Sequence, residues 1–391
     1  MNTTPATGPI PHPGHRDGRH RLCGPEPAPG EGAWQALHIF YPGSPRPMLT
    51  RAVRPLLDEL TADGLITNYF FLNYWLEGPH VRLRLKPARP GAEAEVRART
   101  EQAIGAFLRS RPALYQVTSE FYVELYNTLF DQEFTEEERR PYLDADGRMR
   151  LRATNTYSWE PYAPEYGKYG GPAGVALAEW HFRHSTDLVI DAMRGMNLQV
   201  RTVLLGFAAQ LMMTMTAVLL DDRDAVAAYL ERYHHFWHRS FSGTALVDPG
   251  EAYDRTYDAM ADGLRARFET VLDATASGTT DHLPGAVRTW ARHCTELRTA
   301  VAGLAVRGEL EFRDWENGGT TTVTDPGAAL QILLSPYMHM TNNRLHVTIR
   351  DEAYLSYVLA RSLTDEPGGR NGTDTQPARG GGPAATHEDG E

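Results

Sequence analysis

The chain has 391 residues and a net charge of −11, with 41% hydrophobic and 23% charged side chains. These values are typical of a globular protein with a sizeable core. The acidic balance argues against a general nucleic-acid binder, which would carry a basic excess. The chain has two cysteines, Cys23 and Cys294. We expect no disulfide, no cysteine-based metal site and a reducing, cytoplasmic setting.

Both ends of the chain have the composition of disordered tails. Residues 1–32 are rich in Pro, Gly, His and Arg, and residues 365–391 are rich in Gly and Pro with hardly an apolar side chain. Such segments bury too little apolar surface to fold. We therefore predict one folded unit over residues 33–364. Its longest apolar region, Leu204–Leu220, is interpreted as a buried helix because it is short for a membrane span.

Residues 33–130 carry strand and helix patterns in a regular order. Alternating or aromatic-rich runs predict strands, and apolar residues at helical spacing predict helices. The predicted strands are Trp34–Tyr41, Ile66–Trp75, His80–Lys86 and Tyr115–Tyr126, and the predicted helices are Met48–Ala62 and Ala92–Arg109. The order βαββαβ indicates a ferredoxin-like split βαβ sheet, antiparallel, with helices packed on one face.

The rest of the folded unit divides into an insertion and a helical part. Residues 131–171 are polar and aromatic, and their turn residues favour an ordered loop or lid over a helix. Residues 172–364 show apolar periodicity typical of helices. The predicted helices are Gly174–Met193, Val200–Leu220, Asp222–Phe241, Glu251–Ala274, Pro284–Val306, Pro326–Val347 and Asp351–Leu363. We therefore predict an α+β fold in which the sheet packs with a mainly helical C-terminal half.

Cationic and apolar residues alternate in the stretch NYWLEGPHVRLRLKP, residues 73–87. Its cations Arg82, Arg84 and Lys86 alternate with Val81, Leu83 and Leu85. In a strand these two sets point to opposite faces, so the apolar set can meet the helices. The cationic face is either the solvated side of the sheet or an anion site, since guanidinium groups bind carboxylate and phosphate bidentately.

A second candidate segment is SPYMHMTNNRLHV, residues 335–347. His339 and Asn343 are four residues apart and therefore share a helix face, with Arg344 nearby. His339 is either an ordinary core or surface residue or a general acid/base, because imidazole titrates near neutrality.

A third candidate segment is PYAPEYGKYGGPAGVALAEWHFRHS, residues 161–185. Its glycines allow a turn that delivers Lys168 just before a helix carrying Glu179, His184 and Ser185. The spacing is neither GxGxxG nor a Walker motif, so we reject a nucleotide loop. A functional loop and a simple glycine-rich turn both remain open.

His234 and His238 have the i, i+4 spacing of a zinc helix. The glutamate of HExxH and an obvious third ligand are missing from this segment. We therefore expect no metal site there.

Four segments, taken in order, resemble the C-terminal elimination domain of class I lantibiotic dehydratases and its stand-alone relatives in thiopeptide biosynthesis. They are WQALHIFY, FFLNYWLEGPHVRLRL, YAPEYGKYGGPAGVALAEWHFRHS and HMTNNRL, and the resemblance spans residues 34–363. It implies action on a ribosomal precursor peptide. Dehydratase members remove glutamate from a glutamylated serine or threonine to leave dehydroalanine or dehydrobutyrine. Other stand-alone members condense two dehydroalanines in a formal (4+2) cycloaddition that gives a six-membered nitrogen ring and releases the leader peptide.

The resemblance also implies roles for single residues. Arg82 and Arg84, which match the arginines of a PHxRxR motif, would hold the glutamyl group together with Lys168. His339, which matches the histidine of an HMxxNR motif, would transfer the proton, and Glu352 would orient the site. The implied substrate-binding positions are His80, Tyr74, Asn73, Glu179, Ser185, Asn343, Arg344 and Glu352.

Two positions depart from the family pattern. Asn73 stands where relatives often have arginine, and Lys168 stands in place of the arginine of RYGG. Lysine keeps the charge of arginine but loses its planar fork.

The expected function is glutamate elimination, and the alternatives are the cycloaddition and non-catalytic presentation of the precursor peptide. The expected partners are that peptide, with leader and core, and a separate glutamyl-tRNA-dependent glutamylating dehydratase subunit. A homodimer is possible among such relatives. Neither a membrane nor a nucleic acid is an expected direct partner. Neither reaction requires redox chemistry or a metal, so no cofactor is expected.

Overall fold

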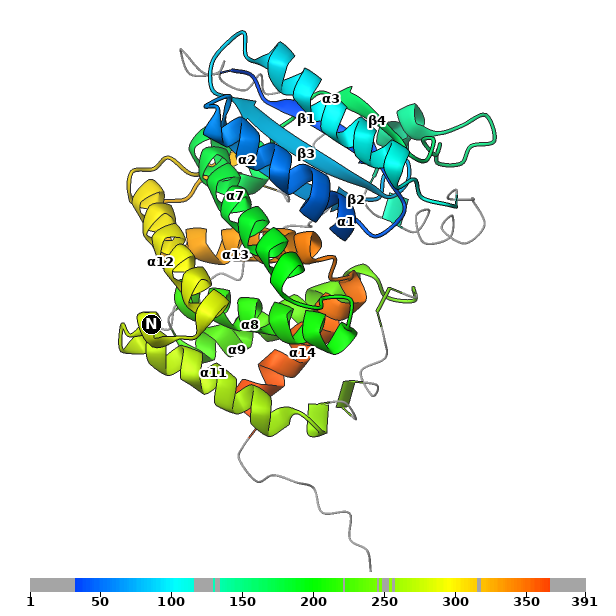
Figure 1. Cartoon of the computed structure of the whole chain (residues 1–391). Coiled ribbons are helices and arrows are strands. Elements are labelled where there is room, and N and C mark those ends of the chain that lie inside the picture. The colour runs from blue at the N-terminus through cyan, green and yellow to red at the C-terminus, as the bar shows by residue number, and fades with distance from the viewer. Residues whose placement is uncertain are drawn as a thin grey trace, which may run out of the picture.

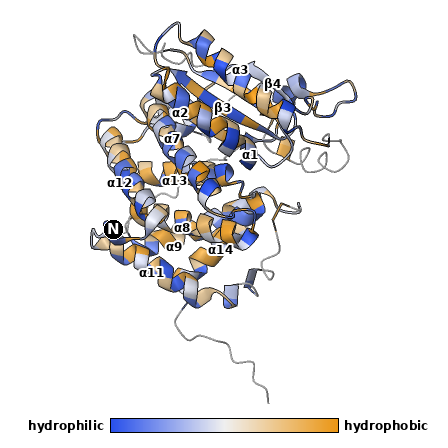
Figure 2. Ribbon diagram, in the orientation of Figure 1, coloured by the Kyte–Doolittle hydropathy of each residue, from blue (hydrophilic) through white to orange (hydrophobic). Residues whose placement is uncertain are grey.

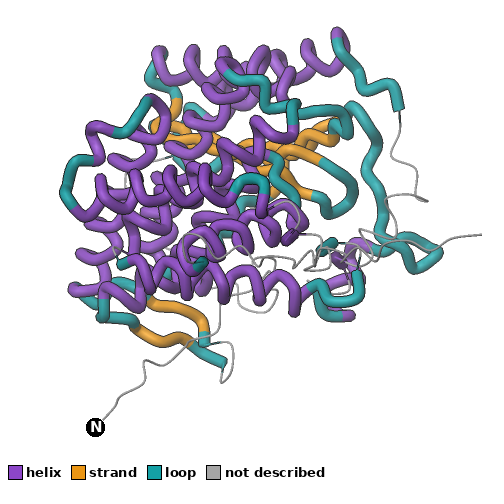
Figure 3. The backbone as a smooth tube through the Cα atoms, turned by 90° about the horizontal axis from the view of Figure 1, so that it is seen from below, coloured by secondary structure: helices purple, strands orange, loops and turns teal. Residues whose placement is uncertain are grey.

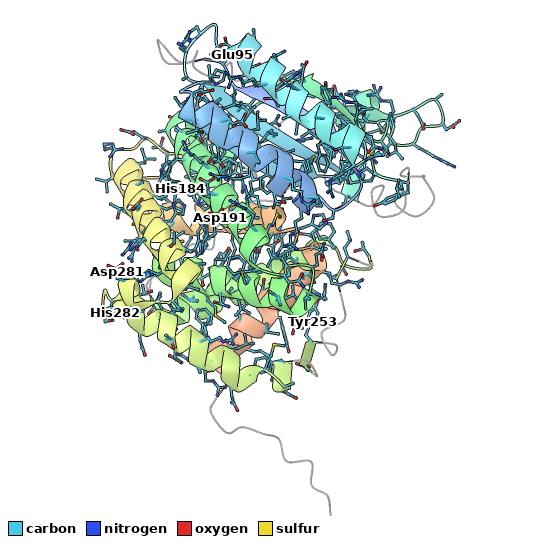
Figure 4. All side chains as sticks on the ribbon, in the orientation of Figure 1. Glu95, His184, Asp191, Tyr253, Asp281 and His282 are labelled. Carbon is cyan, nitrogen blue, oxygen red and sulfur yellow. The ribbon has the colours of Figure 1, made fainter. Side chains whose placement is uncertain are left out.

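The computed structural model describes residues 32–115, 129–130, 134–220, 222–244, 246–247, 253–254, 257–314 and 318–365. In Figure 1 a small sheet lies above a larger group of helices. Helices α2 (Arg54–Ala62) and α3 (Glu93–Ser110) lie in front of the sheet, and α7 (Gly171–Gly195) runs between the two parts. Figure 4 shows Glu95 of α3 on the outer side, away from the helical part.

Four strands form the sheet, which is antiparallel throughout and has the order β2-β3-β1-β4. They are β1 (Gln35–Phe40), β2 (Ile66–Tyr74), β3 (His80–Pro87) and β4 (Thr156–Glu160). The turn between β2 and β3 places Gly78 at a φ of 108°, a torsion that glycine adopts without steric cost.

One face of the sheet is apolar and packs against the first helices. Leu83 of β3 lies opposite Leu37 of β1 and Phe71 of β2, and all three side chains are fully buried. The chain enters α2 through α1 (Arg46–Met48) and one π-helical turn, Leu49–Val53. The apolar residues of the alternating strand β3 therefore face the first helices, as the sequence predicted.

The other face of the sheet points toward the helical half. That half consists of α7, α8 (Arg201–Leu220), α9 (Arg223–Ser240), α11 (Ala261–Ala276), α12 (Gly285–Val306), α13 (Pro326–Leu345) and α14 (Ile349–Thr364). Both α7 and α13 contact β2. Helix α8 contacts α9, α11, α12, α13 and α14, and Figure 2 shows hydrophobic residues along α8 and α14.

Helix α8 is long and apolar enough to cross a membrane, and it is the only such helix in the described part of the chain. However, 67% of its apolar window is buried inside the protein. That burial matches the interpretation of this region as a core helix.

Short elements complete the chain. They are α5 (Glu136–Arg139), a 3₁₀ turn at Arg140–Tyr142, α6 (Tyr166–Tyr169), a 3₁₀ turn at Thr280–His282, and the hairpin of β5 (Glu311–Arg313) and β6 (Thr320–Thr322). Figure 3 shows the hairpin apart from the four-stranded sheet, and β5 packs against α6.

The prediction of a mixed α+β fold with a small antiparallel sheet is confirmed. The sequence placed the fourth strand at Tyr115–Tyr126, which lies outside the described residues apart from Tyr115. The fourth strand of the described sheet is β4, which belongs to the segment interpreted as an ordered loop or lid. That interpretation is therefore wrong for the strand at residues 156–160 and for the short helical elements at residues 136–142 and 166–169. The ferredoxin-like class stays a prediction. The tails predicted at both ends lie outside the described residues, except for the residues at 32 and 365.

Two histidines pair inside the helical half. His181 of α7 and His293 of α12 are buried, with Nδ1 of His181 2.8 Å from Nε2 of His293. Burial lowers the pKa of His293 to about 3, and burial lowers the pKa of His181 well below its ordinary value. The neighbouring His184, labelled in Figure 4, is exposed on α7 and stacks on His293.

This pairing predicts a loss of stability in mild acid. Unfolded His293 takes up a proton near pH 6.5, whereas the folded residue resists it down to about pH 3, so stability falls as pH drops through 6.5. At pH 5 this one group costs about 2 kcal/mol. Denaturant unfolding at pH 7 and pH 5 should show a smaller pH-dependent loss for His293→Phe than for the parent. An equal loss in both proteins would contradict this account.

Candidate functional site

A cavity of about 750 Å³ opens between the sheet and the helical half. Its walls come from the ends of β2 and β3, from α6 and α7, from α9, and from the junction of α13 and α14. Aromatic side chains make much of the lining: Phe70, Tyr74, Trp75, Tyr162, Tyr169, Phe182, Trp237 and Phe241. A pocket of this size, apolar with a few polar groups, is typical of a ligand site.

The cationic face of β3 forms one wall of this cavity. Arg82 and Arg84 line it, and each is only 5% exposed. The interpretation of the cationic face as the solvated side of the sheet is therefore wrong for these two residues. Helices cover that face, which the sequence pattern alone could not show.

Aromatic rings and histidines hold the two guanidinium groups. The Arg82 guanidinium carbon lies 3.5 Å from the centre of the Tyr74 ring, and its Nε donates to Nε2 of His80 at 3.1 Å. Arg84 lies 5.3 Å from the Tyr162 ring. Ring faces attract a cation without cancelling its charge. These ring contacts therefore stabilise the two cations without neutralising them.

Two carboxylates and a lysine stand beside this wall. Tyr162 donates to Glu179 at 2.7 Å, and burial with the neighbouring Glu179 holds the pKa of Tyr162 well above its ordinary value. Lys168 is buried, with Nζ 3.6 Å from a carboxylate oxygen of Glu165. All four side chains line the cavity. Tyr162 is thus a neutral donor, and Lys168 is already paired with an anion.

Glycines shape the turn that carries Lys168. Gly170 and Gly171 have φ values of 88° and 77°, in the region that favours glycine. A Cβ at Gly174 would lie 1.8 Å from the carbonyl oxygen of Tyr169. The glycine-rich stretch therefore permits the tight passage from α6 into α7.

A histidine held by a carboxylate forms part of another wall. Nδ1 of His339 lies 2.9 Å from Oε2 of Glu352. The buried Glu352 also accepts from the Tyr233 hydroxyl and, at 3.1 Å, from Nδ2 of Asn342. With Nδ1 directed to the carboxylate, Nε2 is the nitrogen left for proton exchange in the cavity that His339 lines. Trp237 packs 5.3 Å from the His339 ring.

Two asparagines clamp β2 to α13. The backbone nitrogen of Asn73 donates to Oδ1 of Asn343 at 2.9 Å, and Nδ2 of Asn343 donates back to the Asn73 carbonyl at 2.9 Å. Nδ2 of Asn73 donates to the Asn343 carbonyl at 2.7 Å. Since His339 lies one helical turn before Asn343, these three bonds fix its wall relative to the sheet.

The cavity brings together most of the residues singled out in the sequence. Those that line it are Asn73, Tyr74, Arg82, Arg84, Lys168, Glu179, His339 and Asn343. His80 lies behind Arg82 and lines a second cavity of about 370 Å³, which shares Asn73, Tyr74, Pro79 and His346 with the first. Glu352 stands behind His339.

Ser185 and Arg344 are buried outside both cavities. The Ser185 hydroxyl donates to the carbonyl of Phe182. The Arg344 guanidinium lies 4.5 Å from the Phe182 ring and donates to the Met340 carbonyl. Burial lowers the pKa of Arg344 to about 9, so the side chain stays charged at neutral pH. The positions of Ser185 and Arg344 therefore do not support a direct contact with a substrate.

The sequence reasoning missed several residues of the cavity. Tyr162 and Glu165 lie in the third candidate segment, but no spacing rule distinguished them there. Arg201, His346 and Arg350 also line the cavity. Arg201 and Arg350 come from the starts of α8 and α14, and His346 caps the end of α13 within the second candidate segment. The sequence shows only ordinary helix boundaries at these positions. Arg201 is ion-paired with Asp351.

Comparisons with known proteins identify the family of the chain. The model of the lantibiotic biosynthesis dehydratase C-terminal family matches residues 34–363, and the chain belongs to that family. No curated protein matches the chain.

Similar solved structures include the following three. One is described as the pyridine synthase TbtD from thiomuracin biosynthesis, with a TM-score of 0.62, 23% identity, and coverage of 84% of this chain and 97% of that chain. TsrL has a TM-score of 0.59 and 19% identity, covering 85% and 94%. The tRNA-dependent lantibiotic dehydratase MibB from Microbispora sp. 107891 has a TM-score of 0.42 and 19% identity, covering 86% and 28%. The first two show a shared fold.

The clamp predicts an order of stabilities. Asn343→Ala removes two hydrogen bonds and leaves two backbone groups of Asn73 without these partners, so it should lower the free energy of unfolding by about 2–3 kcal/mol. Asn73→Ala removes one hydrogen bond and should lower it by about 1 kcal/mol. Asn68→Ala, which loses only a bond to the next residue, is the control. Denaturant unfolding measures all three. The reverse order would show that the clamp does not join the two parts.

Proposed function

We propose that the chain closes the six-membered nitrogen ring of a thiopeptide-type precursor by a formal (4+2) cycloaddition between two dehydroalanines. The observation that supports this most is the cavity itself, where a carboxylate-held histidine and a guanidinium pair line one aromatic space of about 750 Å³. Clefts of this size enclose most of a drug-sized ligand, and we propose that this one takes both dehydroalanine segments of a folded-back peptide.

The reaction needs proton transfer and polarised carbonyl groups. In this cycloaddition an amide carbonyl carbon is one end of the diene, so two carbon–carbon bonds form and the oxygen at that carbon takes up protons and leaves as water. Aromatisation then releases the leader peptide as its amide. His339 is the proposed proton carrier, and Arg82 and Arg84 are the proposed donors to carbonyl oxygens. Bringing the two alkenes together supplies much of the rate.

Two residues favour ring closure over glutamate elimination. The Asn73 side chain, which stands where relatives often carry arginine, is engaged in the clamp with Asn343. Lys168 is paired with Glu165. These two positions are therefore poorly suited to hold the carboxylate of a glutamyl group. The fold shared with a pyridine synthase over 97% of that chain supports the same choice.

Elimination of glutamate from a glutamylated serine or threonine is the second candidate. It rests on Arg82, Arg84 and His339, which offer an anion site and a base in one cavity. In that case a separate glutamylating dehydratase would supply the substrate. Non-catalytic presentation of the precursor peptide is the remaining alternative. In each case the proposed partner is a ribosomal precursor peptide with its leader.

The substrate experiment separates the two reactions. The protein is incubated with a dehydrated, azole-bearing precursor peptide, and in parallel with a glutamylated one, and products are followed by mass spectrometry. Ring closure predicts loss of water and release of the leader from the first peptide only. Loss of glutamate from the second peptide, with the first unchanged, would replace our proposal with the elimination reaction.

Variants of the histidine and its carboxylate test the proton carrier. His339→Ala should lower kcat by about 100-fold or more, and Glu352→Gln should lower it less, because an amide still accepts the Nδ1–H but carries no charge. His184→Gln, on the exposed side of α7, is the control and should keep full activity. Full activity of His339→Ala would instead support a protein that only presents the peptide.

A further inference from the structure

Two histidines lie beneath the arginine wall. His38 of β1 and His80 of β3 are buried on the same face of the sheet as Arg82, and their rings stack with centroids 5.0 Å apart. His38 is the register partner of Arg82, and Phe40 packs 4.6 Å from the His80 ring. The motif resemblance offered His80 as a substrate-binding residue and gave His38 no role.

The hydrogen bonds determine which nitrogen of His80 carries the proton. Arginine has donors and no acceptor, so the contact from Nε of Arg82 to Nε2 of His80, at 3.1 Å, requires a lone pair on Nε2. On the other side, Nδ1 of His80 lies 2.8 Å from the carbonyl oxygen of Gly78, which can only accept. His80 is therefore neutral and carries its proton on Nδ1.

His38 also accepts a hydrogen bond from an arginine. Nη1 of Arg84 lies 3.3 Å from Nε2 of His38, and the arginine has to be the donor. Each arginine of the wall thus donates to Nε2 of one buried histidine. Neither histidine is among the residues that line the main cavity.

We propose that His38 and His80 are positioning residues that orient the arginine pair as neutral acceptors. A carboxylate in either place would bind the guanidinium group more strongly, but it would add a negative charge beside that group. A neutral imidazole fixes the orientation of the guanidinium group and adds no charge. The role in turnover rests on the proposed function, whereas the orientation of the arginines does not.

The protonation state is tested on the unmodified protein without any ligand. Nitrogen-15 NMR of labelled histidine at neutral pH should show both His38 and His80 as neutral rings with the proton on Nδ1. A proton on Nε2, or a doubly protonated ring, would overturn the proposal, because Arg82 or Arg84 would then face a donor.

Paired variants test the positioning. Glutamine places an acceptor near the Nε2 position, whereas leucine removes it, so His80→Gln should keep an ordered Arg82 Nε–H signal and His80→Leu should lose it. The same contrast is expected for His38→Gln and His38→Leu in the Arg84 signals. Equal signals in the glutamine and leucine variants, at equal unfolding free energies, would overturn the proposal.

The turnover of the same glutamine and leucine variants is then compared. Leucine variants should lower kcat for ring closure by about 10-fold or more, with KM little changed, and glutamine variants should stay within about 3-fold of the parent. Equal loss in both variants would overturn the positioning role. If the unmodified protein does not close the ring, the proposed function is wrong. The NMR signals of the histidines and arginines would still test whether His38 and His80 orient Arg84 and Arg82.

Discussion

The burial of two guanidinium groups on one face of a four-stranded sheet is the constraint on which the site depends. A buried charge without partners costs several kcal/mol, and Arg82 and Arg84 are each only 5% exposed. Their partners include neutral groups: the rings of Tyr74 and Tyr162, and the two histidines behind them. These contacts offset part of the cost of burial and add no negative charge of their own. This arrangement suits carbonyl oxygens and small anions.

The site also requires that cavity walls from distant parts of the sequence keep a fixed position relative to each other. Asn73 and Asn343 are 270 residues apart, and their three hydrogen bonds tie the end of β2 to the helix that carries His339. A displacement of about 1 Å between reacting groups can cost 100-fold in rate. Asn73, one of the two positions at which the resemblance implies a departure from the family pattern, thus has a structural role. Asparagine at position 73 supplies alignment where arginine would supply charge.

Much of this arrangement could be predicted from local patterns, because periodicities of 2 and 3.6 residues are visible in long elements. The three longer strands and the helices of the second half are examples. The clustering of Arg82, Arg84, Lys168 and His339 was implied by the family resemblance, because no period links residues so far apart in the sequence. Strand β4 and the β5–β6 hairpin are too short to show a period. Alternation in β3 showed that two faces differ, but it could not show what covers the cationic one. His38 was missed because its partner is chosen by strand register, which no local spacing encodes.

The central claim is that the arginine wall and the His339–Glu352 pair act on the same peptide in one cavity. The most direct measurement is a crystal structure with an unreactive precursor analogue in which alanine replaces both dehydroalanines. The account predicts that the peptide lies in the cavity with carbonyl oxygens at Arg82 or Arg84 and a polar atom within hydrogen-bond distance of Nε2 of His339. A peptide bound away from these residues would contradict it.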